Sequence, residues 1–176
     1  MRHRGRAHED FLAVTLPSID LVYNLARRMV GADEVEDLVQ ETYLKAFDAW
    51  KRNRRPRKVE PWIATICRNA GRSWLRSAAR RREVPYETLP EGAAAQEVEA
   101  LALGAVEARA VHDALWQLPE EQRIAIALMD LAGFTAAETG RITDSPRGTV
   151  LARVHRGRKR LAHLLRSEKE VLPFEP

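Results

Sequence analysis

Residues 145–160 constrain the fold of this chain more than any other stretch. They begin with Ser145, a good helix N-cap residue, and Pro146, which suits a first helical turn. Val150 and Val154 then mark an apolar side, and an arginine-rich series at helical spacing occupies the other side. Such a helix, placed directly after a short turn, is suited to lie in a groove of DNA. The residues expected on its DNA side are Arg147, Thr149, Arg153, Arg156 and Arg160.

The preceding residues 133–142 predict a shorter supporting helix. Thr135 is an expected N-cap residue, and Glu138 stands three positions later, as in a capping box. Gly140 lies inside this helix, where glycine costs about 1 kcal/mol relative to alanine. Thr143 and Asp144 would form the turn. The two segments together predict a helix-turn-helix, against the simpler alternative of a basic helix whose charged side only faces solvent.

Residues 33–50 predict a long amphipathic helix far from the helix-turn-helix. Asp33 and Glu36 have the spacing of a capping box. Asp37, Gln40 and Glu41 fall outside the apolar stripe and are expected at the surface. The buried stripe is expected to contain Val35, Leu38, Val39, Tyr43, Ala46, Phe47 and Trp50.

Two parts of the sequence resemble one known family. Residues 37–47, DLVQETYLKAF, resemble the helix with which bacterial RNA polymerase sigma factors bind core polymerase. Residues 118–123 and 148–158 resemble the promoter-reading C-terminal domain of the same family. The short chain is similar to the extracytoplasmic-function (ECF) type. The resemblance implies an all-α fold in which two small helical domains are joined by a flexible linker.

The resemblance also implies the domain boundaries. Pro85, Pro90 and Gly92 interrupt regular structure between the two similar parts and favour a linker there. The expected divisions are an N-terminal extension at 1–15, a sigma region 2-like domain at 16–82, a linker at 83–106, a sigma region 4-like domain at 107–167 and a tail at 168–176.

The family's functional residues map onto three groups here. Asp37, Gln40 and Glu41 correspond to the polymerase contact, and the helix-turn-helix series above to the upstream (−35) promoter element. A helix expected over residues 61–82 carries a continuous polar side at spacings of three and four. The resemblance places Lys45, Ile66, Asn69, Arg72, Ser73 and Arg76 at the downstream (−10) element, which includes an unstacked base.

Composition agrees with a nucleic-acid-binding protein. The net charge is +4, and basic blocks at 51–58, 76–82 and 153–160 are separated by an acidic segment at 83–107. The single cysteine, Cys67, excludes an internal disulfide and is expected to be buried. The N-terminus lacks the apolar segment of a signal peptide, so we expect a cytoplasmic protein. We expect no enzyme activity, because the sequence shows no catalytic constellation, metal-ligand spacing or nucleotide-binding loop.

Partners follow from the resemblance. They are core RNA polymerase, through its beta and beta′ subunits, promoter DNA, and an anti-sigma factor that would hide the Asp37–Glu41 surface. Protease is expected to cut the free chain first between residues 83 and 97. Two alternatives remain open: a helix-turn-helix operator-binding regulator that needs no polymerase, and a helical adaptor that binds protein only. Tight sequence-specific DNA binding by the isolated chain would favour the operator-binding regulator. The absence of salt-dependent DNA binding would favour the protein-binding adaptor.

Overall fold

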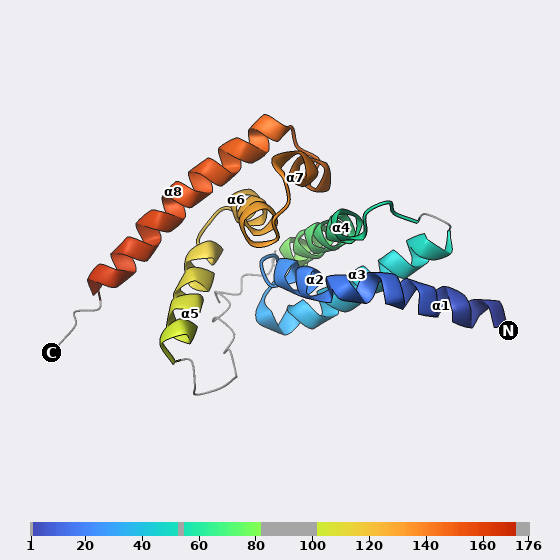
Figure 1. The fold of residues 1–176 in the computed structure, drawn as a ribbon. Coiled ribbons are helices and arrows are strands. Elements are labelled where there is room, and N and C mark those ends of the chain that lie inside the picture. Colours follow the sequence, from blue (N-terminus) through green and yellow to red (C-terminus); the bar gives the residue numbers. More distant parts are fainter. Residues whose placement is uncertain (1, 53–54, 82–101, 172–176) are drawn as a thin grey trace.

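The computed structural model describes residues 2–52, 55–81 and 102–171, and within these ranges every regular element is a helix (Figure 1). The N-terminal half contains α1 (Arg2–Thr15), α2 (Ile19–Ala26), α3 (Val35–Lys51) and α4 (Val59–Arg81). The C-terminal half contains α5 (Ala102–Trp116), α6 (Glu120–Ile126), α7 (Ala136–Thr143) and α8 (Arg147–Val171). Short turns of other helix types precede α2 and α3 at Leu16–Ser18 and Ala32–Glu34, and a π-helical turn, Ala127–Leu131, continues α6.

The amphipathic pattern of residues 33–50 does form a helix, but it begins later than predicted. The 3₁₀ turn at Ala32–Glu34 makes Glu34 the N-cap residue, and no side chain caps the helix. Glu36 therefore stands at the second helical position, so the predicted Asp33–Glu36 capping box is wrong. Glu36 and Asp37 still lie in the first turn, where negative charge favours the helix dipole.

Within the expected N-terminal extension, residues 2–15 form helix α1. Phe11 of α1 is buried against Ala46 and Trp50 of α3. The hydroxyl of Tyr43 donates a hydrogen bond to the carbonyl of Thr15 at 3.1 Å. Aromatic burial of this kind ties α1 to the body of the domain.

The predicted helix-turn-helix is present in α7 and α8. The hydroxyl of Thr135 accepts from the backbone N–H of Glu138 at 3.2 Å, and the Glu138 carboxylate accepts from the backbone N–H of Thr135 at 3.1 Å. This capping box is therefore confirmed. The last residues of the expected linker, 102–106, belong to α5. The remainder, residues 83–101, lies outside the described residues.

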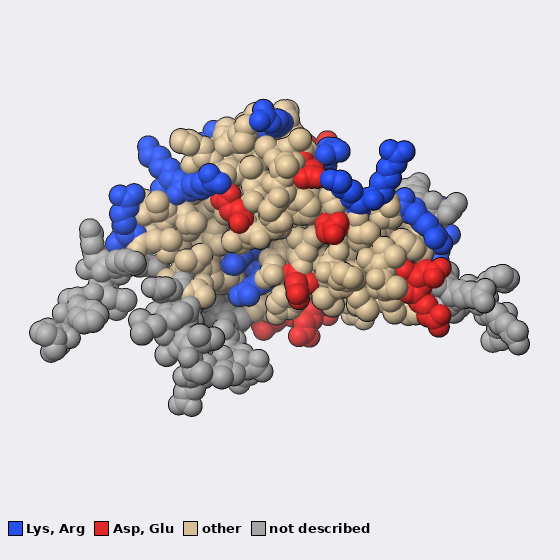
Figure 2. All heavy atoms as spheres, viewed as in Figure 1, with Lys and Arg blue, Asp and Glu red and all other residues tan. Residues whose placement is uncertain are grey.

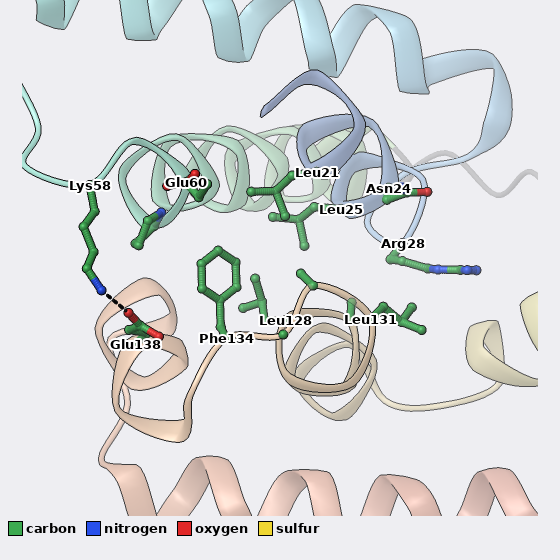
Figure 3. Close-up of a pocket in the computed structure, with 14 residues that line it drawn as sticks. Leu21, Asn24, Leu25, Arg28, Lys58, Glu60, Leu128, Leu131, Phe134 and Glu138 are labelled. Carbon is green, nitrogen blue, oxygen red and sulfur yellow. Dashed lines mark hydrogen bonds and ion pairs between the residues drawn. The ribbon is translucent and has the colours of Figure 1, made fainter. Parts of the chain in front are cut away.

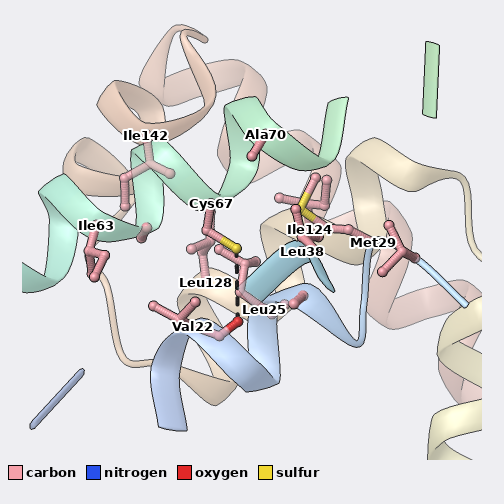
Figure 4. Close-up of a cluster of buried hydrophobic side chains, with 14 of the residues drawn as sticks. Val22, Leu25, Met29, Leu38, Ile63, Cys67, Ala70, Ile124, Leu128 and Ile142 are labelled. Carbon is pink, nitrogen blue, oxygen red and sulfur yellow. Dashed lines mark hydrogen bonds between the residues drawn. The ribbon is translucent and has the colours of Figure 1, made fainter. Parts of the chain in front are cut away.

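The two halves share one hydrophobic core. Helix α7 lies beside α4, and the π-helical turn Ala127–Leu131 lies against α2 (Figure 1), so apolar side chains from both halves meet between them. The N-terminal half contributes residues that include Val22, Leu25 and Ile63, and the C-terminal half contributes Ile124 and Ile142 (Figure 4). We call this group the shared core. Its burial stabilises the closed arrangement of the halves, because removing apolar surface from water is favourable.

Candidate nucleic-acid interface

The outer side of α3 carries the residues expected to bind polymerase. Asp37 and Gln40 are exposed, and Glu41, one turn after Asp37, is half-buried. These three residues lie on a different side of the helix from the buried Leu38. Leu44 follows on this side with 60% of its surface exposed, and the sequence analysis did not single it out. We call these four residues the α3 face. An apolar residue beside acidic and amide groups is suited to a protein partner more than to DNA, whose phosphates would repel the carboxylates.

The residues expected at the −10 element do not all lie together. Asn69, Arg72, Ser73 and Arg76 are exposed on the outer side of α4 and form what we call the α4 face. Lys45 lies on α3, where its ammonium pairs with Glu41 at 2.6 Å. Ile66 is half-buried and packs against the cluster of Phe11, Ala46 and Trp50.

Hydrogen bonds order part of the α4 face. The Ser73 hydroxyl donates to the backbone carbonyl of Asn69 at 3.1 Å, and the Arg76 guanidinium donates to the Ser73 hydroxyl at 3.2 Å. The Oδ1 atom of Asn69 accepts from Arg68 at 3.1 Å. Its amide nitrogen is thereby directed away from Arg68, so the Asn69 amide can donate to a base edge.

Arg68 is a functional candidate that sequence reasoning missed. It also donates to the backbone carbonyl of Thr143, at the end of α7, at 2.9 Å. Burial, followed by the nearby charge of Arg72, lowers its pKa. Arg68 therefore joins the α4 face to the helix-turn-helix. No local sequence signal could have found it, because the acceptor is a main-chain oxygen distant in the sequence.

The turn between α7 and α8 explains the unusual glycine in the supporting helix. A Cβ at position 140 would lie 2.7 Å from the carbonyl oxygen of Ser145. The backbone N–H of Ser145 also donates to the Gly140 carbonyl at 2.9 Å, and Asp144 adopts a left-handed conformation with φ of 51°. Gly140 thus permits the close approach that makes this turn tight, which offsets its low helix propensity.

The arginines of α8 divide into two kinds. Arg147, Arg156 and Arg160 are exposed. The Arg153 side chain is only 17% exposed, and its guanidinium donates to the Ser145 hydroxyl at 2.7 Å and pairs with Glu121 of α6 at 2.6 Å. Helix α8 begins at Arg147, so Ser145 and Pro146 both precede it and the predicted N-cap role of Ser145 is wrong. The Ser145 hydroxyl instead accepts from Arg153 and donates to the Thr143 carbonyl. Thr149, the one member of the predicted series that is not an arginine, is half-buried.

Positive charge follows the outer edge of the helix-turn-helix. Figure 2 shows lysine and arginine side chains along the upper left of the molecule, where α8 lies in Figure 1. The inner side of α8 packs closely on α6, since a Cβ at Gly157 would lie 2.7 Å from Ile126. The helix is therefore held by its inner side and offers its basic side to solvent.

Polar contacts reinforce the shared core between the two halves. Arg123 of α6 is buried and donates to the backbone carbonyl of Arg28 at 2.6 Å. Arg28 in turn hydrogen-bonds the Nδ1 atom of His112 on α5. Burial, then the charges of Arg28, Arg27 and Arg123, lower the pKa of His112, and Asp113 opposes this. The Nδ1 atom of a neutral His112 can accept a hydrogen bond from the Arg28 guanidinium, so the contact favours the closed arrangement.

A groove of about 780 Å³ lies at the junction of the halves. Phe134, Leu128 and Leu131 line it from the C-terminal half, opposite Leu21 and Leu25 of α2 (Figure 3). At one end the Lys58 ammonium pairs with the Glu138 carboxylate at 3.0 Å (Figure 3). That contact, with the hydrogen bonds from Thr135, holds the pKa of Glu138 at about 2. The groove is apolar along its floor and charged at its ends.

The described residues show no group of three or more metal-ligating side chains. Burial raises the pKa of the Cys67 thiol to about 12, which removes it as a nucleophile near neutral pH. No helix within the described ranges is long and apolar enough to cross a membrane.

Known proteins with the same arrangement identify the family. Residues 18–81 match Sigma-70 region 2, and residues 108–161 match Sigma-70, region 4. The ECF RNA polymerase sigma factor SigE of Mycolicibacterium smegmatis is 34% identical over 83% of this chain and 58% of its own length. The ECF RNA polymerase sigma-E factor of Escherichia coli (strain K12) is 31% identical over 78% of this chain and 77% of its own length.

Solved structures agree with the sequence comparisons. The sigma factor RpoE of Bartonella quintana, in a complex with the anti-sigma factor NepR, superposes with a TM-score of 0.79. It is 28% identical, and the match covers 90% of this chain and 98% of that one. The chain is an all-α transcription initiation factor with the two sigma regions. It belongs to the ECF-type RNA polymerase sigma factors.

Proposed function

We propose that this chain binds core RNA polymerase through the α3 face and directs it to promoters through the α4 face and α8. One observation carries the proposal: an exposed acidic and apolar surface on α3 and exposed basic residues on α4 and α8 occur on one framework with both sigma regions. The chain spans 58% of the length of its relative from M. smegmatis, and the functional assignment rests on the two matched regions.

The polymerase contact is the first element of the proposal. Replacing Asp37 and Glu41 together by alanine should weaken binding to core polymerase without unfolding the chain, since Asp37 is exposed and Glu41 only half-buried. The double variant Glu9→Ala/Asp10→Ala removes the same charge from exposed positions on α1 and serves as the control. Fluorescence anisotropy with core polymerase measures both. Equal affinity of the two double variants would contradict the assignment of the α3 face.

Promoter recognition is the second element. We propose that Arg147, Arg156 and Arg160 contact DNA at the −35 element, whereas Arg153 holds α8 in place through Ser145 and Glu121. The α4 face, with Asn69 at its centre, would hold the opened −10 element. Asn69→Ala should then impair promoter melting more than initial duplex binding, as permanganate footprinting of the polymerase complex can show. Equal melting by the variant and the parent protein would reject this role.

Run-off transcription tests the function as a whole. Core polymerase with this chain should start transcripts at promoters that core polymerase alone does not use. Transcription that does not depend on the chain, together with tight operator binding by the isolated chain, would support the alternative regulator without polymerase.

Regulation by an anti-sigma factor is the third element. The related RpoE and CnrH structures are complexes with NepR and with the cytosolic domain of CnrY, respectively. In this chain, α7 packs on α4 and Arg68 donates to the Thr143 carbonyl, so the closed halves restrict part of α4. We propose that an anti-sigma protein stabilises this closed arrangement. Energy transfer between dyes on α3 and α8 should fall when polymerase binds the chain and should be retained when an anti-sigma protein binds it instead.

A further inference from the structure

The outward side of α8 follows from which residues its inner side buries. Val150 and Val154 are buried, and Gly157 touches Ile126. With 3.6 residues per turn, the side opposite these residues carries Gly148, Ala152 and His155, and Leu151 lies on its flank. Leu151 is 40% exposed, His155 is exposed and Ala152 is half-buried. Leu151 and Ala152 therefore add apolar groups to the surface that this helix offers to a partner.

This surface is the part of a helix-turn-helix that reads DNA. The recognition helix enters the major groove with its N-terminal residues against the base edges. Leu151 is the fifth residue of α8 and Ala152, half-buried, is the sixth. Arg147 and Arg156 are exposed on either side of them and can reach the phosphates.

One polar candidate for base contact beside Ala152 is already engaged. Arg153 pairs with Glu121 and donates to Ser145, so its hydrogen-bond donors are directed into the protein. Leu151 has neither a donor nor an acceptor. The apolar group that the major groove presents to a protein is the C5-methyl of thymine.

We infer that Leu151, with Ala152 beside it, reads thymine methyl groups in the −35 element. This inference rests on the proposed function and names the base feature that the recognition helix selects. Specificity at these positions would come from apolar contact, with the flanking arginines supplying affinity that does not depend on sequence. Removing one thymine methyl from this contact should lower affinity about four-fold, because burying one carbon of this size contributes about 0.8 kcal/mol.

Deoxyuridine substitution tests the inference, because uracil differs from thymine only by that methyl. Holoenzyme made from core polymerase and the full chain first selects duplexes from a library randomised over the −35 region. Each thymine of the selected duplex is then replaced singly by deoxyuridine, and affinity is measured by competition. We expect about four-fold weaker binding at one or two positions, and a constant affinity elsewhere.

Variants show whether Leu151 is the cause. Leu151→Ala shortens an exposed side chain and should lose most of the discrimination between thymine and uracil at the position that Leu151 contacts, although an alanine methyl can still touch the base. Leu131→Ala, at an exposed leucine outside α8, should keep the parent protein's discrimination. If the selected duplex is bound tightly but no thymine is sensitive, or Leu151→Ala discriminates as strongly as the parent protein at every position, the inference is overturned while the proposed function stands. If selection enriches no sequence, both fail.

Discussion

Arg123 is the residue whose replacement should most weaken the closed arrangement of the two halves. Its guanidinium donates to the backbone carbonyls of Arg28 at 2.6 Å, Trp116 at 3.2 Å and Leu118 at 3.3 Å. It also lies over the Trp116 ring, 4.1 Å from the centroid. Hydrogen bonds from a charged donor contribute roughly 1.5–3 kcal/mol each. Burial of the charge opposes this, as the lowered pKa of Arg123 indicates, so Arg123→Ala should reduce the free energy of unfolding by about 3 kcal/mol.

Urea denaturation of the full chain measures this loss, and thermal melting should show a fall of about 9 °C for a chain of this size. Arg109→Ala is the matched control, because Arg109 is exposed and its guanidinium makes only a long contact, 3.9 Å, with the Asp113 carboxylate. This variant should lose less than about 0.5 kcal/mol of the free energy of unfolding. Arg123→Lys keeps the charge without the planar set of donors and should fall between the two. A loss below about 1 kcal/mol for Arg123→Ala would refute the reasoning, as would unchanged scattering dimensions in a variant that is destabilised as expected.

Three further predictions concern other contacts. Burial and neighbouring arginines lower the pKa of His112 below the usual value of about 6.5, so its contribution to stability is complete above pH 6.5 and declines as pH falls below it. Urea midpoints measured from pH 8 to 5 should therefore decline less in His112→Gln than in the parent protein. An identical decline in both proteins would exclude His112 as the source of the pH dependence. Gly157→Ala should destabilise the chain by about 1 kcal/mol, because crowding against α6 outweighs the gain in helix propensity. Gly148→Ala should stabilise the chain slightly, because no atom lies within 4 Å of the new Cβ. Equal thermal shifts in the two variants would show that the packing argument fails. Arg156→Ala should reduce by about one unit the slope with which the logarithm of −35 affinity falls with the logarithm of salt concentration. Arg153→Ala should instead lower the stability of the chain and leave that slope unchanged. The opposite result would reverse the roles assigned to the two arginines.

Local patterns predicted much of the helical framework. The Thr135–Glu138 capping box and the apolar stripe around Leu38 involve residues close together in the sequence, so spacing was sufficient to find them. The Asp33 capping box failed because a 3₁₀ turn shifted the start of α3, and element boundaries depend on such small energies. The burial of Phe11 could not be read from a segment whose partner lies on another helix.

The candidate site was predicted less completely, for the same reason. Periodicity placed Asn69 and Arg72 on an exposed side of α4 but left out Arg68, because its hydrogen bond to the Thr143 carbonyl depends on a distant segment. It likewise placed Arg153 with the other arginines of α8, because spacing does not reveal that Glu121 and Ser145 lie within reach. Tertiary contacts decide which side chains remain available for a partner.

Main-chain acceptors at the junction have a consequence for how this protein can evolve. Arg68 binds the carbonyl oxygen of Thr143, and Arg123 binds that of Arg28. A carbonyl is present whichever amino acid occupies a position, so the accepting residues can be exchanged without removing the contact. At these two contacts, selection for closure would therefore act on the arginines alone. Paired substitutions would be scarce there, and the two contacts would leave little trace in residue covariation, unlike the Lys58–Glu138 and Arg28–His112 pairs, in which both partners are side chains.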